Sequence, residues 1–141
     1  MKQAKGNLWE FPAEVKLITT NGFVKKDGSC VMGRGCALEA KKKFPGIEFR
    51  LGKFLQAHGN RCFRLAPDLA TFPTKHNWME QSDIELIKKS CGEIMAMADK
   101  FSWVTIVLPR PGCGNGGLKW EDVEPIISEL LDDRFTVITF D

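Results

Sequence analysis

The chain has 141 residues, of which 43% are hydrophobic and 27% charged, and its formal net charge at pH 7 is +2. This length is enough for one domain with a substantial core and too short for two, so we expect a single domain over residues 1–141. The composition is typical of a globular protein and excludes a disordered chain. The small net charge does not predict nucleic-acid binding, but it is compatible with a nucleic-acid substrate held at one site.

The cysteines and histidines exclude two common kinds of site. Five cysteines and two histidines are present, without a close Cys-x-x-Cys pair, so neither a disulfide framework nor a zinc site is predicted, and we expect no metal and no cofactor. The amino-terminal residues are polar, and no apolar run approaches the ~20 residues that a membrane span requires. We therefore expect a cytoplasmic monomer that does not associate with membranes.

The first half of the chain predicts a strand followed by two helices. Residues 14–20 combine alternating polarity with β-branched side chains, which is typical of a strand, and an early apolar strand is expected near the centre of a sheet. A polar loop follows over residues 23–34. The spacing of apolar residues then predicts helices over residues 35–44 and 47–58, the second of which ends at Gly59.

The middle of the chain predicts a short β-structure and one long helix. Residues 61–71 predict a strand pair or a bent hairpin, and residues 72–78, which contain a proline, are expected to interrupt regular structure. Apolar residues at helical spacing predict an amphipathic helix over residues 82–100, with Ser82 as its capping residue.

The end of the chain completes the alternation of strands and helices. A strand is predicted over residues 103–108, a helix over residues 121–131 and a final strand over residues 135–140. Strands that alternate with helices favour the α/β class, and we predict a three-layer α/β/α fold with a mixed, mostly parallel central sheet.

A glycine-rich segment lies between the strand at 103–108 and the helix at 121–131. Four of the six residues from 112 to 117 are glycines, which lets a ligand approach the main chain and lets several N–H groups turn toward an anion. A second small loop, Gly33-Arg34-Gly35, opens the helix at 35–44, and Asn21 ends the first strand. In a parallel sheet these three segments meet at one edge, which predicts a site for two phosphates or a diphosphate. The alternative is a connection without a ligand, although such a connection usually needs only about two to six residues and not four glycines.

Five motifs in order along the chain make the sequence similar to a known family. Together they resemble the macro domain, an ADP-ribose-binding module, over nearly the whole chain. The resemblance is to the branch that contains the terminal ADP-ribose–glutamate hydrolase and the antitoxin macro domains that remove ADP-ribose from thymidine in DNA. The motifs are Gly6-Asn7-Leu8, Thr20-Asn21-Gly22, residues 32–37, residues 41–44 and residues 109–120.

The resemblance implies a role for each motif. Asn7 and Leu8 stand where the family contacts adenine, and Asn21 stands where it holds the terminal ribose and takes part in catalysis. Lys75 falls at the position of the catalytic lysine of this branch. The remaining contacts implied are to the ribose and phosphates from Gly33, Arg34, Gly35 and Cys36, and to the diphosphate from Gly112, Cys113, Gly114, Asn115, Gly116 and Gly117.

Two positions depart from the family pattern. Asn7 replaces the usual aspartate, and its amide oxygen can still accept a hydrogen bond from the adenine amine, without the assistance of a charge. Gly116 stands where the glutamate-directed hydrolase has an aspartate that assists the lysine. This second departure favours the DNA-directed activity over the glutamate-directed one.

The sequence therefore predicts a protein that binds ADP-ribose and hydrolyses an ADP-ribosyl linkage, with ADP-ribosylated DNA or protein as its partner. Lys75 would attack the ring-opened ribose as a Schiff base or stabilise the leaving group by its charge. Three alternatives are a phosphatase that acts on ADP-ribose 1''-phosphate, a reader that binds ADP-ribose without turnover, and a protein that sequesters a signalling molecule derived from ADP-ribose.

Other side chains near these motifs are interpreted without a catalytic role. Cys113 is interpreted as packing within its loop, because neither histidine has a sequence relationship to it. His76 could donate a proton beside Lys75 but is interpreted as a solvated loop residue. Trp9 and Trp78 could stack on a base or on adenine but are interpreted as buried packing.

Overall fold

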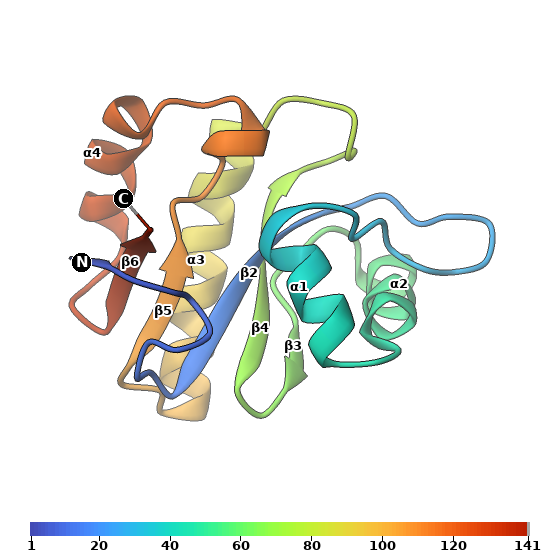
Figure 1. Ribbon diagram of the computed structural model, residues 1–141, viewed down its shortest axis with the longest axis horizontal. Helices are drawn as coiled ribbons and strands as arrows, with labels where there is room; N and C mark the ends of the chain where they lie inside the picture. Colours follow the sequence, from blue (N-terminus) through green and yellow to red (C-terminus); the bar gives the residue numbers. More distant parts are fainter. Residues whose placement is uncertain (141) are drawn as a thin grey trace.

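The computed structural model describes residues 1–140 and contains a six-stranded sheet, four α-helices and a short 3₁₀ helix (Figure 1). The strands are β1 (Lys2–Lys5), β2 (Val15–Asn21), β3 (Arg64–Ala66), β4 (Leu69–Lys75), β5 (Ile106–Pro109) and β6 (Phe135–Thr139). The helices are α1 (Gly35–Lys43), α2 (Ile47–His58), α3 (Ile84–Phe101) and α4 (Trp120–Leu130), and the 3₁₀ helix is η1 (Gly114–Gly116). Within residues 1–140, no helix is both long and apolar enough to cross a membrane.

The sheet is mixed and mostly parallel. Its strand order is β1-β6-β5-β2-β4-β3, and every neighbouring pair is parallel except β3 with β4. β2 lies between β5 and β4, which confirms the central position expected for the first apolar strand. Parallel neighbours need long crossover connections, and most of these connections contain helices. The predicted α/β class is therefore confirmed.

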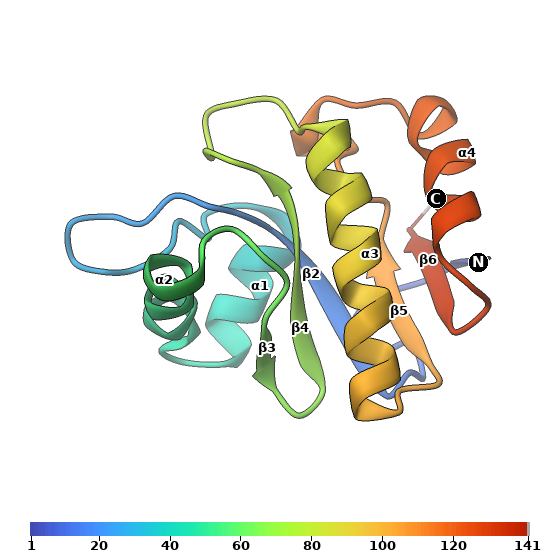
Figure 2. The ribbon, with the colours of Figure 1, turned by 180° about the vertical axis from the view of Figure 1, so that it is seen from behind.

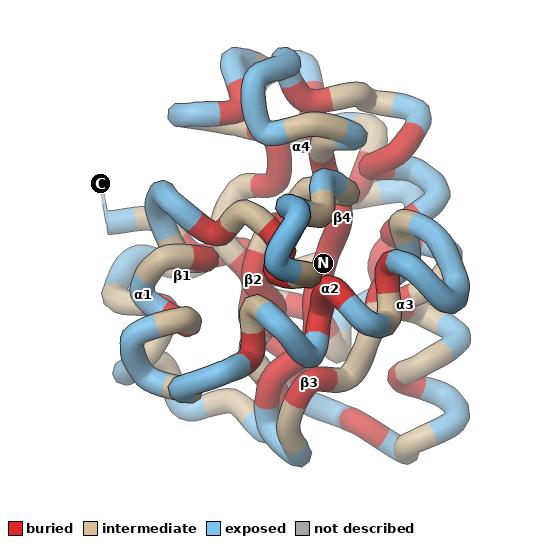
Figure 3. Tube along the Cα trace, turned by 90° about the vertical axis from the view of Figure 1, so that its right-hand side faces the viewer, coloured by how far each residue is buried: buried red, intermediate tan, exposed pale blue. Residues whose placement is uncertain are grey.

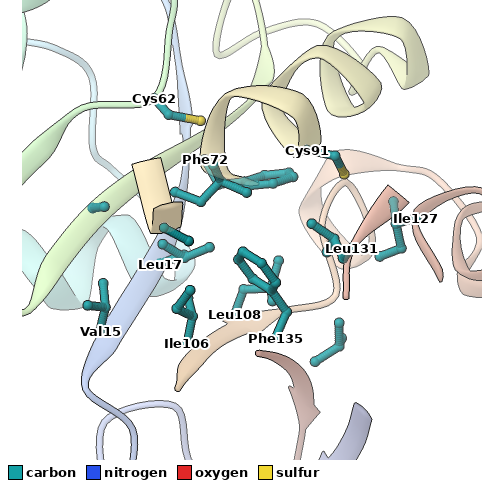
Figure 4. Close-up of a cluster of buried hydrophobic side chains, with 14 of the residues drawn as sticks. Val15, Leu17, Cys62, Phe72, Cys91, Ile106, Leu108, Ile127, Leu131 and Phe135 are labelled. Atoms are coloured by element: carbon teal, nitrogen blue, oxygen red, sulfur yellow. The ribbon is translucent and has the colours of Figure 1, made fainter. Parts of the chain in front are cut away.

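Helices cover both faces of the sheet, and the two larger clusters of buried apolar side chains lie beneath them. α1 lies in front of the sheet in Figure 1, and the reverse view in Figure 2 shows α3 across the opposite face. The core beneath α3 and α4 includes Leu17, Phe72 and Phe135 (Figure 4), whereas the core beneath α1 and α2 includes Ile18 and Leu51. Leu17 and Ile18, which are adjacent in β2, thus pack on opposite faces of the sheet, as expected for a strand covered on both sides. The buried segments in Figure 3 accordingly run along the strands.

The structure differs from the predicted strands at two places. The polar amino-terminal residues form β1, which was not predicted; it is an edge strand that pairs only with β6, and an edge tolerates exposed polar side chains. β4 also continues through Pro73 to Lys75, where an interruption was expected. The Thr71 N–H donates to the carbonyl oxygen of Phe63 on the β3 side. Pro73, two residues further on, therefore turns its missing N–H to the same side, beyond the amino-terminal start of the antiparallel β3.

The predicted cap of the long helix is also wrong. α3 begins at Ile84, and the side chain of Asp83 accepts a hydrogen bond from the Glu85 N–H at 2.9 Å. Asp83 is therefore the capping residue. Ser82 lies one residue earlier, and its backbone N–H donates to the carbonyl oxygen of Gly116 at 2.9 Å. The residue predicted to begin the helix instead joins the helix to the glycine-rich loop.

Close packing of α2 against the loop after β2 can be tested at Gly52. A Cβ at this position would collide with the carbonyl oxygen of Gly28. We expect Gly52→Ala to lower the free energy of unfolding by about 1–3 kcal/mol, because backbone must move to admit the methyl group. Gly92→Ala in α3 is the control, because a Cβ there meets no atom within 4 Å, and it should raise the free energy of unfolding by up to about 1 kcal/mol. Urea unfolding measures both, and equal effects would contradict the contact.

Candidate functional site

A cavity of about 1080 Å³ opens at the carboxyl ends of β2, β4, β5 and β6. Its other walls are the start of α1 and the glycine-rich loop between β5 and α4. In Figure 1 the glycine-rich loop, drawn in orange, and the loop from β4 to α3, drawn in yellow-green, lie at this end of the sheet. The volume lies just above the range of about 300–1,000 Å³ found for small-molecule sites. The cavity is at the edge where the sequence predicts a ligand.

The two residues predicted to be catalytic are direct neighbours in the sheet. Thr20 of β2 pairs with Pro73 of β4, but the next pair is Asn21 with Lys75, so β4 carries one extra residue, Thr74. A bulge of this kind changes the direction of the side chains that follow it. Asn21 and Lys75 both line the cavity, as does Thr74. The irregular end of the β2–β4 ladder therefore places these two side chains at one end of the cavity.

The side chain of Asn21 also organises the loop that follows β2. Its Nδ2 donates to the carbonyl oxygen of Val31 at 2.8 Å, and its Oδ1 accepts the Phe23 N–H at 3.0 Å. A side-chain amide has two N–H donors, so one remains for a ligand. Asn21 thus holds the loop and still offers a donor at the cavity wall.

Lys75 connects β4 to the glycine-rich loop. Its Nζ donates to the carbonyl oxygen of Asn115 at 3.2 Å and to that of Trp78 at 3.5 Å. Its own carbonyl oxygen accepts a hydrogen bond from Asn60 Nδ2 at 2.9 Å. Both ends of the residue are therefore held, with the Nζ between the two loops that border the cavity.

The start of α1 forms a wall that suits an anion. Arg34 occupies the capping position, and no side chain caps the helix. The first N–H groups of a helix have no partner within it, and together with the helix dipole they favour negative charge. Gly35 has a φ of 57°, a conformation that favours glycine. Gly33, Arg34, Gly35 and Cys36 all line the cavity.

The glycine-rich loop faces this helix start across the cavity. Gly112 has a φ of 79°, and a Cβ there would lie 2.7 Å from the Cδ1 of Ile87 and 2.9 Å from the Cδ1 of Leu118. Among the hydrogen bonds within residues 1–140, none uses the backbone N–H of Gly114 or Asn115. The loop is therefore packed tightly from behind and retains donors for an anion.

The cavity does not contact every residue of the predicted binding set. Leu8 lines it, but Asn7 does not, and the Oδ1 of Asn7 accepts the Trp9 N–H at 2.8 Å. In the glycine-rich loop, Gly112, Cys113, Asn115 and Gly116 line the cavity, whereas Gly114 and Gly117 lie outside its lining. The contacts assigned to Asn7, Gly114 and Gly117 stay predictions.

The two cysteines at the cavity are poorly suited to nucleophilic attack. Burial raises the pKa of the Cys113 thiol and of the Cys36 thiol. The sulfur of Cys36 lies 3.4 Å from the backbone nitrogen of Thr19, and the thiol of Cys113 donates to the carbonyl oxygen of Pro111 at 3.7 Å. A thiol with a raised pKa is mostly protonated at neutral pH, which favours the packing interpretation of Cys113.

The sequence assigned Trp78 to the core, and this is wrong. Its side chain is 45% exposed and lines the cavity, because the loop from β4 to α3 has no layer above it. Trp9, by contrast, is partly buried. It packs against the core beneath α1 and α2 and against a smaller cluster formed by Leu8, Val107 and Ile138. Trp9 Nε1 lies 3.2 Å from Glu39 Oε1, within hydrogen-bonding distance. The packing interpretation of Trp9 agrees with this position.

Ser82 is a cavity residue that the sequence did not predict. It is 7% exposed, and its Oγ has no hydrogen-bond partner within residues 1–140. A Cβ on Gly116 would collide with this Oγ. An aspartate at position 116 therefore has no room while Ser82 keeps its place. No signal in the sequence identifies this contact, because the two residues lie far apart in the chain.

Comparison with known proteins identifies the family. The family model of the macro domain matches residues 63–127. The chain is 30% identical to the ADP-ribose glycohydrolase OARD1 of Bos taurus, over 96% of this chain and 88% of that protein. The chain belongs to the macro domain family. The resemblance found in the five motifs is thus confirmed.

The fold of this macro domain is also similar to that of solved relatives. The macrodomain of Thermus aquaticus DarG superposes with a TM-score of 0.81 at 30% identity, over 99% of this chain and 97% of that one. The DNA ADP-ribosyl glycohydrolase of Thermus aquaticus is 28% identical over 94% of this chain. This macro domain spans only 38% of the length of that relative.

Because a Cβ on Gly116 would collide with Ser82, we expect substitutions at these two residues to have coupled effects on the free energy of unfolding. We expect Gly116→Ala to lower the free energy of unfolding by about 1–3 kcal/mol, because the new methyl group meets the Ser82 hydroxyl. The loss should be smaller when Ser82→Ala is already present, since that change removes the nearest atom. Chemical denaturation of both single variants and the double variant gives the coupling energy. Strict additivity would show that the two side chains do not compete for this space.

Proposed function

We propose that this macro domain binds ADP-ribose and hydrolyses the bond between the terminal ribose and a leaving group. The observation that carries the proposal is the pairing of Asn21 with Lys75 at one end of a cavity whose walls present free backbone N–H groups. Binding would place the terminal ribose beside Asn21, where Lys75 assists the cleavage of its bond to the leaving group. We also propose, from composition alone, that the domain acts as a cytoplasmic monomer away from membranes.

The bound ADP-ribose would lie along the cavity. Its diphosphate fits between the start of α1, which no side chain caps, and the glycine-rich loop, where the Asn115 backbone N–H has no partner within residues 1–140. The adenine would then point toward Leu8 and Ile138, which line the other end. The terminal ribose would reach Asn21, whose remaining amide N–H is available to a ribose hydroxyl.

The reaction follows from the position of Lys75. As the bond to the leaving group breaks, positive charge develops on the ribose and negative charge on the leaving atom. Lys75 Nζ is already held as a donor by the carbonyl oxygens of Asn115 and Trp78, so it can stabilise the departing atom without rearrangement. Water adds its hydroxyl to the anomeric carbon and its proton goes to the leaving group, which yields ADP-ribose. An imine nitrogen keeps at most one N–H, so Schiff-base attack would cost Nζ at least one of these two contacts, and we favour the first role.

We propose thymidine in DNA as the preferred leaving group. Two observations support this choice. The relative from Thermus aquaticus is a DNA ADP-ribosyl glycohydrolase. Position 116 is glycine, and the hydroxyl of Ser82 fills the space that an assisting aspartate would need.

Removal of the lysine amine should separate binding from turnover. We expect Lys75→Ala to reduce release of ADP-ribose by at least about a hundredfold, the lower end of the effect of losing one stabilising donor. Its affinity for free ADP-ribose, measured by calorimetry, should change by less than about fivefold. The substrates are thymidine-modified single-stranded DNA and glutamate-modified protein.

Lys53→Ala is the matched control, because Lys53 is an exposed lysine of α2 outside the cavity, and it should keep both properties. If wild type binds ADP-ribose but releases it from neither substrate, the hydrolase proposal is wrong for these linkages and the domain is a reader. If Lys75→Ala keeps full turnover, the assigned role of Lys75 is wrong.

A further inference from the structure

A second hollow of about 530 Å³ adjoins the main cavity. Lys75, Asn115 and Gly116 line both spaces, so the hydrogen bond between Lys75 Nζ and the Asn115 carbonyl oxygen lies at the partition. The second space, which we call the outer hollow, also shares Arg34, Trp78 and Met79 with the main cavity, and Glu80, Gln81 and Gly117 line it alone. It therefore begins where the proposed position of the terminal ribose ends.

We propose that the outer hollow holds the leaving group as a nucleobase and that Trp78 stacks on this base. The inference rests on the proposed function, in which the terminal ribose lies beside Asn21 and Lys75. A leaving group bonded to the anomeric carbon must then continue past Lys75. The outer hollow lies directly on that course, and it is large enough for a small-molecule group.

Trp78 has the properties of a stacking platform. Its side chain is 45% exposed and that of its neighbour Met79 is 68% exposed, although both are large and apolar. Exposed apolar side chains gathered at a hollow indicate a binding surface. An aromatic ring beside the strand path is how proteins hold single-stranded nucleic acid, since every base offers a flat face.

The loop that carries Trp78 is held in place before any ligand arrives. Asn77 Oδ1 accepts the Met79 N–H at 3.1 Å, and the Asn77 carbonyl oxygen accepts the Glu80 N–H at 3.1 Å. His76 Nε2 lies 2.8 Å from Asp83 Oδ2, which joins the start of the loop to the cap of α3. A loop fixed by these contacts loses little conformational entropy when a base stacks on it.

The charges around the outer hollow favour a nucleotide over a glutamate side chain. Arg34 lines both spaces, is exposed, and forms no ion pair within residues 1–140, so its guanidinium is available to a backbone phosphate. Glu80 also borders the outer hollow. Its carboxylate would repel the carboxylate that glutamate becomes on release, whereas a thymine that takes up its proton on release can donate that single N–H to it.

The test compares Trp78→Ala with Trp78→Phe on two substrates and one ligand. We expect Trp78→Ala to lower kcat/KM for thymidine-modified single-stranded DNA by about tenfold to a hundredfold, mainly through KM, as loss of one base–aromatic stack predicts. Trp78→Phe should restore most of the loss. Affinity for free ADP-ribose and kcat/KM for glutamate-modified protein should stay within about twofold. Val104→Ala, a change at a residue that is 66% exposed and outside both spaces, is the control for surface truncation.

A binding measurement tests the outer hollow independently of the hydrolase activity, because it does not require turnover. In the Lys75→Ala background, thymidine-modified DNA should bind at least about tenfold more tightly than free ADP-ribose, and Trp78→Ala should remove that gain. The gain supports the outer hollow even if the wild type releases no ADP-ribose. Equal affinity of the Lys75→Ala variant for the two ligands would overturn the proposal. An equal loss of kcat/KM for the glutamate-modified substrate in Trp78→Ala would also overturn it, because the outer hollow would then bind protein side chains.

Discussion

The parallel pairing of β2 with β4 and β5 is the constraint on which the rest of this macro domain depends. Parallel strands end at the same edge, so every loop that leaves a carboxyl end meets its neighbours there. The three strands bury side chains on both faces, and this burial fixes their register, because a slip of one residue would exchange the faces.

The bulge at the end of the β2–β4 ladder converts this regular sheet into a site. It brings Asn21 level with Lys75 where the regular register would have offered Thr74. The Asn21 amide then orders the loop after β2, and the Lys75 Nζ reaches the loop after β5. Two adjacent residues thus fix the positions of two loops that the sheet itself leaves free, and the proposed ribose position lies between them.

Packing against neighbouring side chains explains the glycines of the glycine-rich loop as well as ligand binding would. Ile87 and Ser82, at the start of α3, leave no room for a side chain at Gly112 or Gly116. The loop can therefore sit close to α3 and present its backbone donors outward. This arrangement lets a protein of small net charge build an anion site, since oriented N–H groups supply local positive potential that formal charge does not record.

Sequence alone determined the class of the fold and the edge at which the site lies. Periodicity identified the helices and the buried strands, because burial on one or both faces leaves a pattern of fixed period, and the glycine-rich segment marked the ligand edge. The polar edge strand β1 left no such pattern. Pro73 was misread because only the position where the antiparallel β3 begins shows that its missing N–H costs no hydrogen bond. The tertiary structure alone decided that Asn21 faces Lys75, that Ser82 fills the space beside Gly116, and that Trp78 is exposed at a second hollow. These are contacts between segments distant in the chain, set by register and packing, and no local pattern encodes them.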